Sequence, residues 1–235
     1  MSLNTTELNV CSQALVIFAK YPAPGQVKTR LARIIGDTAA CEIYRSFTDI
    51  IIEKATVIRD VRIRLDIDPC TDESILYFNK RYPNIDVVPQ SGADLGARML
   101  NSIASACSSG FERTCIIGTD IPDLPSEILD EAFKSLLQND VILGPSNDGG
   151  YYLIGMKKPI SQLFEDIAWS TDTVFSNTSA RVASLGFSLS VLPRFSDVDT
   201  IEDLAGLYGR IDREPETHSS LTELRNKIKM FLPNA

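Results

Sequence analysis

Residues 15–31 of the chain read LVIFAKYPAPGQVKTRL. An apolar run typical of a β-strand enters a loop rich in proline and glycine, and the loop ends in Lys28, Thr29 and Arg30 just before a helical pattern. Backbone N–H groups and fixed positive charges converge in such a loop, and both attract phosphate groups. The stretch predicts a phosphate cradle that binds a nucleotide; the alternative is a surface turn with two solvated cations.

The charge of the chain indicates which kind of anion this loop would bind. The formal net charge is −8, which disfavours a nucleic-acid-binding face. Residues 1–35 nevertheless hold four basic residues and one acidic residue. A positive region on an acidic protein suits a small polyanion, so we expect a nucleotide or nucleotide-sugar as partner and no nucleic acid.

Length and composition favour one domain. The 235 residues contain no linker-like stretch and no internal repeat, so we expect a single domain over residues 1–235. No apolar run approaches the ~20 residues of a membrane span. Residues 1–13 lack the cationic start and apolar core of a signal peptide, and the five cysteines are odd in number and lack C-x-x-C spacing. We therefore expect a cytoplasmic protein with reduced thiols.

Apolar β-like runs alternate with helical patterns along the chain. The expected strands cover residues 14–18, 62–67, 85–88, 115–118, 141–144, 151–156 and 188–192. The expected helices cover residues 38–58, 72–81, 95–108, 126–137, 173–185, 200–208 and 221–231, and the last of these packs on the domain or forms a homodimer contact. The alternation predicts an α/β fold: a three-layer α/β/α arrangement around a mainly parallel, mixed sheet of Rossmann-like type. Ligands bind beyond the carboxyl ends of strands in such sheets.

Catalytic chemistry in this chain falls to carboxylates, lysines, arginines, hydroxyls or a bound metal. The only histidine, His218, lies in a polar segment near the C-terminus and is expected at the surface. Asp120 follows an apolar strand, and Mg²⁺ or Mn²⁺ commonly binds one or two carboxylates together with phosphate oxygens. Asp197 or Asp199 fits a second metal ligand; the alternative is that this segment caps the following helix, with Asp199 or Thr200 as the N-cap residue. We therefore expect a divalent metal at the strand ends.

Three further segments are candidate binding sites. Asp148 lies beside Gly149 and Gly150, and this segment fits a catalytic site, a hairpin turn or both. Residues 90–99 place glycine, an acid and a base at the start of a helix and are candidates to hold a base, a ribose or an acceptor. Trp169, next to two hydroxyl-bearing residues, lines an acceptor pocket or packs in the core or a lid.

Four segments, residues 18–31, 94–99, 118–125 and 144–155, resemble the nucleotide-diphospho-sugar transferase superfamily, which has the GT-A fold. Residues 169–171 and 197–204 are also similar, and the likeness spans most of residues 14–204. Within the superfamily, the chain is most similar to a bacterial family that is provisionally described as glycosyltransferases and is associated with radical-SAM and selenoprotein gene neighbourhoods.

The resemblance implies a nucleotide bound across the first strand and loop, and a divalent metal on acids at the strand ends. It matches Asp120 to the metal-binding acid, Asp199 to a second metal position, and Lys28 and Arg30 to phosphate-binding cations. The chain has Asp-Ile-Pro-Asp at residues 120–123, where glycosyltransferases usually have Asp-x-Asp. Glycosyl transfer and nucleotidyl transfer therefore both stay open.

We predict a metal-dependent transferase that uses a nucleotide-diphospho-sugar, as a glycosyltransferase does, with Mg²⁺ or Mn²⁺ as cofactor. The alternative is a nucleotidylyltransferase that releases pyrophosphate from an NTP, for example a guanylyltransferase acting on a small phospho-acceptor; the third is a non-catalytic nucleotide-binding domain. The predicted catalytic residues are Asp148, Lys28 and Arg30, and the predicted metal ligands are Asp120 and Asp199. The predicted nucleotide-binding residues are Ala19, Lys20, Gly25, Lys28, Arg30, Asp94 and Gly96. The predicted acceptor-binding residues are Gly149, Gly150, Trp169 and Ser170.

Overall fold

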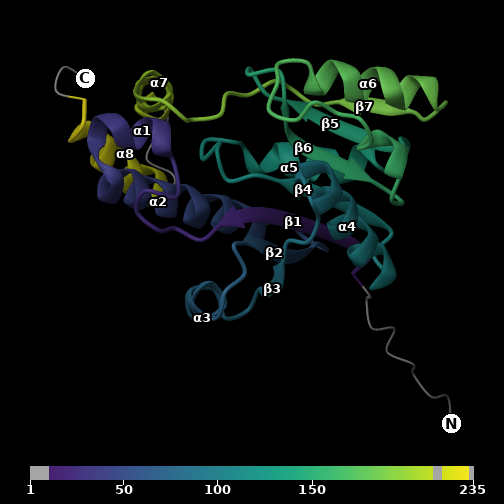
Figure 1. Ribbon diagram of the computed structural model, residues 1–235, viewed down its shortest axis with the longest axis horizontal. Coiled ribbons are helices and arrows are strands. Elements are labelled where there is room, and N and C mark those ends of the chain that lie inside the picture. Colours follow the sequence, from purple (N-terminus) through teal and green to yellow (C-terminus); the bar gives the residue numbers. More distant parts are fainter. Residues whose placement is uncertain (1–10, 214–218, 233–235) are drawn as a thin grey trace, which may run out of the picture.

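The computed structural model describes residues 11–213 and 219–232, so His218 lies outside the described residues. Within them, a seven-stranded sheet runs in the order β3-β2-β1-β4-β6-β5-β7 (Figure 1). The strands are β1 (Gln13–Lys20), β2 (Arg62–Asp68), β3 (Asp86–Pro89), β4 (Arg113–Ile117), β5 (Val141–Pro145), β6 (Tyr151–Met156) and β7 (Leu189–Val191).

Most neighbouring strands of the sheet are parallel. β1 pairs in parallel with β2 and β4, β2 with β3, and β5 with β7. Only β6 runs antiparallel to its neighbours, β4 and β5. The first residue of β6, Tyr151, therefore lies at the edge where the parallel strands end. The mainly parallel, mixed sheet that the sequence predicted is confirmed.

Helices cover both faces of the sheet. They are α1 (Thr29–Ile35), α2 (Asp37–Thr56), α3 (Asp72–Arg81), α4 (Leu95–Ser108), α5 (Ser126–Ser135), α6 (Val174–Ser184), α7 (Ile201–Ile211) and α8 (Ser219–Lys229), with a 3-10 turn η1 (Ser161–Leu163). Successive residues of a strand point to opposite faces. Leu15 and Ile17 of β1 pack with α2, α3 and α5, whereas Val16 packs with α4 and α6. The three-layer arrangement is thus also confirmed.

A separate apolar cluster joins the two ends of the described chain. It includes Leu31 of α1, Phe47 of α2, Leu204 of α7 and Leu224 of α8, and these helices lie together at one end of the molecule (Figure 1). The apolar face of α8 is therefore covered from within the chain, which is one of the two arrangements that the sequence left open. None of the described helices combines the length and the apolar character that crossing a membrane requires.

The predicted elements agree with the structure best in the middle of the chain. α3, α4 and β6 begin and end at the predicted residues. The helical pattern after Arg30 forms a helix of its own, α1, which Gly36 separates from α2. Gly36 has φ of 85°, a conformation that glycine adopts without steric cost. The strand predicted over residues 188–192 is shorter at both ends.

Candidate functional site

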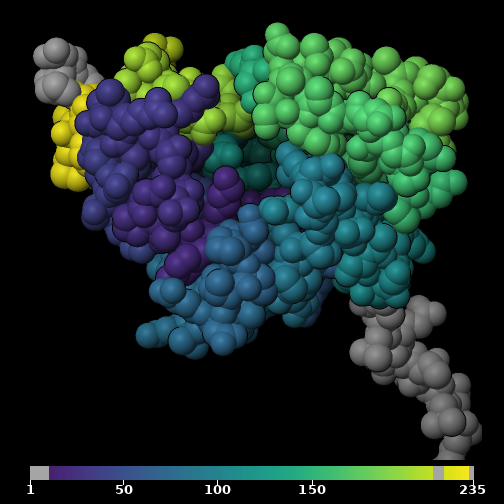
Figure 2. Space-filling model, viewed as in Figure 1, coloured from purple at the N-terminus to yellow at the C-terminus, as the bar shows by residue number. Residues whose placement is uncertain are grey.

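A pocket of about 440 Å³ opens at the carboxyl ends of the strands. Its lining comes from the ends of β1 and β4, the turn between β5 and β6, and the segment that leads into α7. In Figure 2 the surface is hollowed between the purple and blue N-terminal part and the green part of the chain. The pocket thus lies where a parallel sheet is expected to bind its ligand.

Lys28 joins two carboxylates on the pocket wall. Its Nζ donates hydrogen bonds to Oδ1 of Asp120 and to Oδ1 of Asp199, the latter at 2.9 Å. The side chain of Lys28 is 3% exposed, whereas those of Asp120 and Asp199 are 44% and 47% exposed. The cation is therefore covered by protein, and the two acids remain open to solvent and ligands.

The backbone and a buried ring place the Lys28 side chain. Lys28 is the N-cap residue of α1, with φ of 47° and ψ of 44°, a left-handed conformation that is uncommon outside glycine. Its Nζ lies 5.6 Å from the centre of the Phe47 ring in α2. Burial alone would lower the pKa of the ammonium group, but the attraction of Asp120 and Asp199 outweighs burial and raises the pKa above its ordinary value. Lys28 is therefore a permanent positive charge.

Tyr44 of α2 links the ends of β1 and β4. Its hydroxyl accepts hydrogen bonds from the Lys20 backbone N–H at 2.7 Å and from the Thr119 hydroxyl at 3.3 Å. Thr119 directly precedes Asp120, so Tyr44 helps to fix the backbone that carries this carboxylate. The backbone N–H of Lys20 is engaged by Tyr44, and the Lys20 residue is exposed and lines the pocket.

Lys54 of α2 holds the loop that follows Asp120. The Lys54 residue is buried, and its Nζ donates to the backbone carbonyl oxygens of Pro122 and Leu124, each at 2.9 Å. A charged donor makes stronger hydrogen bonds than a neutral one. Lys54 therefore fixes the path of residues 121–124 from beneath.

Asp199 lies two residues before the first residue of α7, Ile201. Thr200 is the N-cap residue and forms a reciprocal capping box with Asp203. Asp203 also accepts a hydrogen bond from the Asp199 backbone N–H at 3.1 Å. The capping role that the sequence left open for Asp199 therefore belongs to Thr200, and the Asp199 carboxylate is directed to Lys28.

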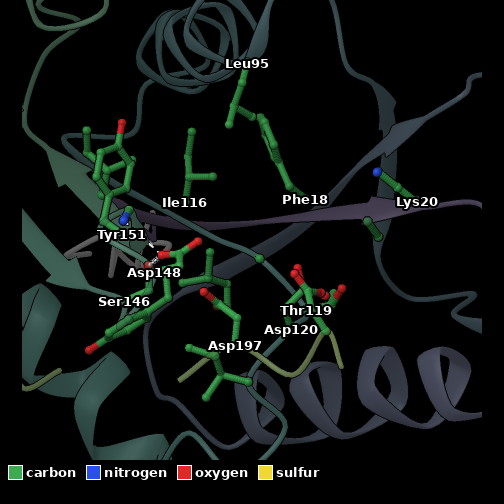
Figure 3. Close-up of a pocket in the computed structure, with 18 of the residues that line it drawn as sticks. Phe18, Lys20, Leu95, Ile116, Thr119, Asp120, Ser146, Asp148, Tyr151 and Asp197 are labelled. Carbon is green, nitrogen blue, oxygen red and sulfur yellow. Dashed lines mark hydrogen bonds between the residues drawn. The ribbon is translucent and has the colours of Figure 1, made fainter. Parts of the chain in front are cut away.

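Asp148 lies in the tight turn between β5 and β6. Its Oδ1 accepts hydrogen bonds from the Ser146 hydroxyl and from the Gly150 backbone N–H, the latter at 2.9 Å. Gly149 has φ of 89°, and a β-carbon there would overlap the backbone of Asp172. The turn forms, and Asp148 also lines the pocket (Figure 3), so the two interpretations of this segment are compatible.

Asp197 is the fourth acid of the pocket. Figure 3 shows its side chain in the pocket together with those of Asp120 and Asp148. Burial, followed by the negative charges of Asp120 and Asp148, raises the pKa of Asp197 to about 7. The carboxyl group of Asp197 therefore changes charge near neutral pH.

The other wall of the pocket is apolar. It is formed by Phe18, Leu95, Ile116, Tyr151 and Trp169, and Figure 3 shows the first three of these across from the acids. The ring centres of Tyr151 and Trp169 lie 6.5 Å apart in an edge-to-face arrangement. Gly96 of α4 leaves room for Trp169, because a β-carbon at position 96 would overlap the indole ring. The pocket thus has a charged half and an apolar half.

The structure brings most of the predicted site residues to this pocket. Those that line it are Ala19, Lys20, Lys28, Asp120, Asp148, Gly150, Trp169, Ser170 and Asp199. Those that lie outside its lining are Gly25, Arg30, Asp94, Gly96 and Gly149. Lining residues that the sequence did not single out include Tyr44, Thr119 and Ser146, and only Thr119 and Ser146 gave a signal, as hydroxyls close to a predicted acid.

Local structure explains why three of these residues, Arg30, Asp94 and Gly25, do not line the pocket. Arg30 is exposed, because it lies in the first turn of α1, and residues two apart on a helix do not face the same side. Lys28 therefore enters the pocket and Arg30 does not. Asp94 caps α4 by accepting a hydrogen bond from the Ala97 backbone N–H at 2.8 Å. Gly25 has φ of 75° and serves the turn.

The pair Asp120 and Asp199 fits a divalent metal that is completed by a substrate. Among the residues that the structure describes, no cluster of three or more His, Cys, Asp or Glu side chains forms a metal site. Mg²⁺ is commonly bound by one or two carboxylates together with phosphate oxygens and water. The Lys28 ammonium group contacts both carboxylates at once.

Comparisons with known proteins identify relatives of this chain. A family model described as "Uncharacterized protein conserved in bacteria (DUF2064)" matches residues 51–171. This range contains Asp120 and Asp148 but neither Lys28 nor Asp199. A protein of Desulfovibrio desulfuricans G20, provisionally described as a nucleotide-diphospho-sugar transferase, is 31% identical, with a TM-score of 0.87 over 94% of this chain and 98% of that chain.

Two more distant solved structures share the fold. The inositol-1-phosphate CTP transferase from T. maritima is 16% identical, with a TM-score of 0.54 over 93% of this chain and 97% of its own. CMP:2-keto-3-deoxy-manno-octonic acid synthetase, in complex with CTP, is 12% identical, with a TM-score of 0.54 over 87% of this chain and 100% of its own. A search of curated protein sequences found no match.

Proposed function

This chain belongs to the DUF2064 family and has the fold of the nucleotide-diphospho-sugar transferases, and we propose that it is a single-domain, metal-dependent transferase that uses a nucleotide-diphospho-sugar. One observation carries the proposal. Lys28, Asp120 and Asp199 come from three distant segments and meet on the wall of one pocket. A cation beside two open carboxylates suits a diphosphate together with its divalent metal.

The charged half of the pocket would receive the diphosphate of the donor. Asp120 and Asp199 would hold Mg²⁺ or Mn²⁺, and the metal, when bound, would supply positive charge to the diphosphate leaving group. Lys28 and Lys20 are the basic residues of the pocket lining and would bind the phosphate oxygens. The 31% identical protein supports the substrate class of the proposal, because it is provisionally described as a nucleotide-diphospho-sugar transferase.

Asp148 would activate the acceptor. The donors on Ser146 and Gly150 both contact Oδ1, which fixes the carboxylate and leaves its other oxygen to accept a proton. The acceptor hydroxyl would give its proton to Asp148 as its oxygen forms a bond with the anomeric carbon. The bond between that carbon and the diphosphate oxygen would break, and the nucleoside diphosphate would leave with the electron pair.

Nucleotidyl transfer is the second candidate. Lys20 and Lys28 give the pocket two cations, as a departing pyrophosphate would require. In this reaction, an acceptor phosphate oxygen would attack the α-phosphorus of an NTP, and the bond to the β-phosphate oxygen would break. Arg30, which the sequence offered as the second phosphate-binding cation for both reactions, lies outside the pocket lining, so Lys20 would take its place in either one.

The products distinguish the two reactions. The protein would be screened by thermal shift against nucleotides and nucleotide-sugars with Mg²⁺ or Mn²⁺, because a ligand that binds the folded state raises the melting temperature. Ligands that stabilise it would then be incubated with candidate acceptors. Release of a nucleoside diphosphate supports glycosyl transfer, and release of pyrophosphate supports nucleotidyl transfer. Turnover that survives Asp120→Asn would contradict the metal assignment.

A further inference from the structure

The Lys28 ammonium group already bridges the carboxylate pair that the proposed function assigns to a metal. Among the described residues, the hydrogen-bond acceptors of Lys28 Nζ are Oδ1 of Asp120 and Oδ1 of Asp199. We propose that Lys28 and a divalent metal are alternative occupants of this pair, so that Lys28 closes the metal site until metal and polyphosphate arrive together. The inference rests on the metal site of the proposed function and concerns the order in which the ligands bind.

Charge repulsion prevents the Lys28 ammonium group and a divalent metal from binding Asp120 and Asp199 at the same time. The lining of the pocket holds two lysines and four aspartates, so the ligand-free pocket has an excess of negative charge that Lys28 partly neutralises. A divalent metal at the same pair of oxygens would lie within a few ångströms of the ammonium group. Like charges at that separation repel strongly when the protein covers one of them, and the Lys28 side chain is 3% exposed. The metal therefore competes with Lys28 for the pair.

The displaced ammonium group needs another anion. A buried cation that loses its partners pays a large desolvation cost, so metal alone displaces Lys28 from Asp120 and Asp199 only at high concentration. Other negative oxygens that replace the two carboxylates lower this cost and let metal bind at lower concentration. The flexible four-carbon stem of lysine allows this movement, and the phosphate groups of a nucleotide supply the oxygens. Metal and polyphosphate then each raise the affinity of the protein for the other, because such coupling is reciprocal.

The first test measures Mn²⁺ binding to the nucleotide-free protein by electron paramagnetic resonance of the unbound ion. Lys28→Met and Lys28→Gln remove the competing charge, and each variant should bind Mn²⁺ roughly tenfold or more tightly than the unmodified protein. Lys28→Arg keeps the charge and should bind Mn²⁺ as weakly as the unmodified protein. Lys20→Met is the matched control, because Lys20 is an exposed lysine of the same pocket, and it should change the affinity much less.

A second substitution checks that the higher Mn²⁺ affinity of the Lys28 variants arises at Asp120 and Asp199. Asp199→Asn, added to Lys28→Met, should return the Mn²⁺ affinity to the level of the unmodified protein or below it. Mn²⁺ binding by Lys28→Met and Lys28→Gln that is no tighter than in the unmodified protein would overturn the inference.

The third test uses the unmodified protein and covers the case in which the variants do not fold. Lysine acetylation, mapped by mass spectrometry, should be slow at Lys28 in the metal-free protein and should rise several-fold relative to Lys20 when Mn²⁺ alone is added. If Mn²⁺ at a concentration that raises the melting temperature of the protein leaves the labelling of Lys28 unchanged, the metal does not replace Lys28 at the carboxylate pair, and the inference is wrong. No nucleotide is used in these tests, so a missing transferase activity and a missing exchange are distinguishable results.

Discussion

The α-carbon of Gly96 lies directly against the indole ring of Trp169, with no space for a β-carbon between α4 and the ring. Residues 73 positions apart therefore meet at one side of the pocket, and a glycine is required for their contact. This contact sets the position of one wall of the apolar half.

Gly96→Ala should push Trp169 out of its place and change the shape of the apolar half. Trp169 is the only tryptophan of the chain, so its fluorescence reports directly on this change. We expect a shift of the emission maximum and weaker binding of any nucleotide-sugar that stabilises the protein. Gly209→Ala is the control, because a β-carbon at position 209 of α7 meets no neighbouring atom within 4 Å. An unchanged spectrum in Gly96→Ala contradicts the contact.

Asp148→Asn should lower kcat by about 100-fold or more and leave KM for the donor nearly unchanged, because a general base acts on the chemical step. The amide keeps an oxygen for the donors on Ser146 and Gly150, so the turn should persist. Steady-state kinetics with the best donor and acceptor from the screen measures the effect. Asp197→Asn is the comparison, as a second acid of the same pocket. A larger loss of kcat in Asp197→Asn would assign the base to Asp197.

Asp66 should make the stability of the protein fall as the pH rises through the titration of this group. Its side chain is 1% exposed. Burial raises the pKa of Asp66 above its ordinary value, although hydrogen bonds from Arg64 and Ser102 oppose the shift. The folded state therefore binds this proton more tightly than the unfolded state, so the stabilisation is present at low pH and is lost above the unfolded pKa of about 4.

Urea unfolding of the unmodified protein and of Asp66→Asn, measured from pH 4 to pH 7, tests this direction. The stability of the unmodified protein relative to Asp66→Asn should decrease as the pH rises, because the variant lacks the titrating group. Glu53→Gln, a change at an exposed residue of α2, is the control. A relative gain in stability with rising pH would show that the ion pair with Arg64 outweighs burial.

Lys54→Met should destabilise the protein by about 1–3 kcal/mol, because the carbonyl oxygens of Pro122 and Leu124 lose a charged donor. The methionine side chain fills a similar volume, so the loss reports the polar contacts more than packing. Chemical denaturation measures the change. Lys134→Met, at an exposed lysine of α5, is the control and should stay within about 0.5 kcal/mol of the unmodified protein. A stable Lys54→Met protein would show that the loop after Asp120 does not depend on Lys54.

Local sequence patterns predict most helices and strands of this chain, because each of these elements depends on a short stretch of neighbouring residues. The apolar run of β1 and the periodicity of α3 and α4 are present in the sequence, and the strand-end rule then brings Asp120 and Asp148 to one edge of the sheet.

The arrangement of the site depends on contacts that no local pattern contains. Nothing near Lys28 in the sequence indicates that its ammonium group meets Asp199, and nothing near Gly96 indicates Trp169. The left-handed backbone at Lys28 also sends this side chain inward while the neighbouring Arg30 faces outward. A motif that treats the two cations alike therefore overstates the positive charge of the pocket.

The hydrogen bond between Lys28 and Asp199 spans 171 positions of the chain. During synthesis, the loop that carries Lys28 therefore leaves the ribosome long before Asp199, its hydrogen-bond partner. Until residue 199 has emerged from the ribosome, the nascent chain lacks one of the two carboxylates that contact Lys28. The proposed binding site is therefore incomplete even if β1 and β4 have already folded. In a series of ribosome-stalled nascent chains of increasing length, ligand binding should therefore appear abruptly in the chains long enough to expose residue 199 and α7. It should not increase gradually as the strands of the sheet are added.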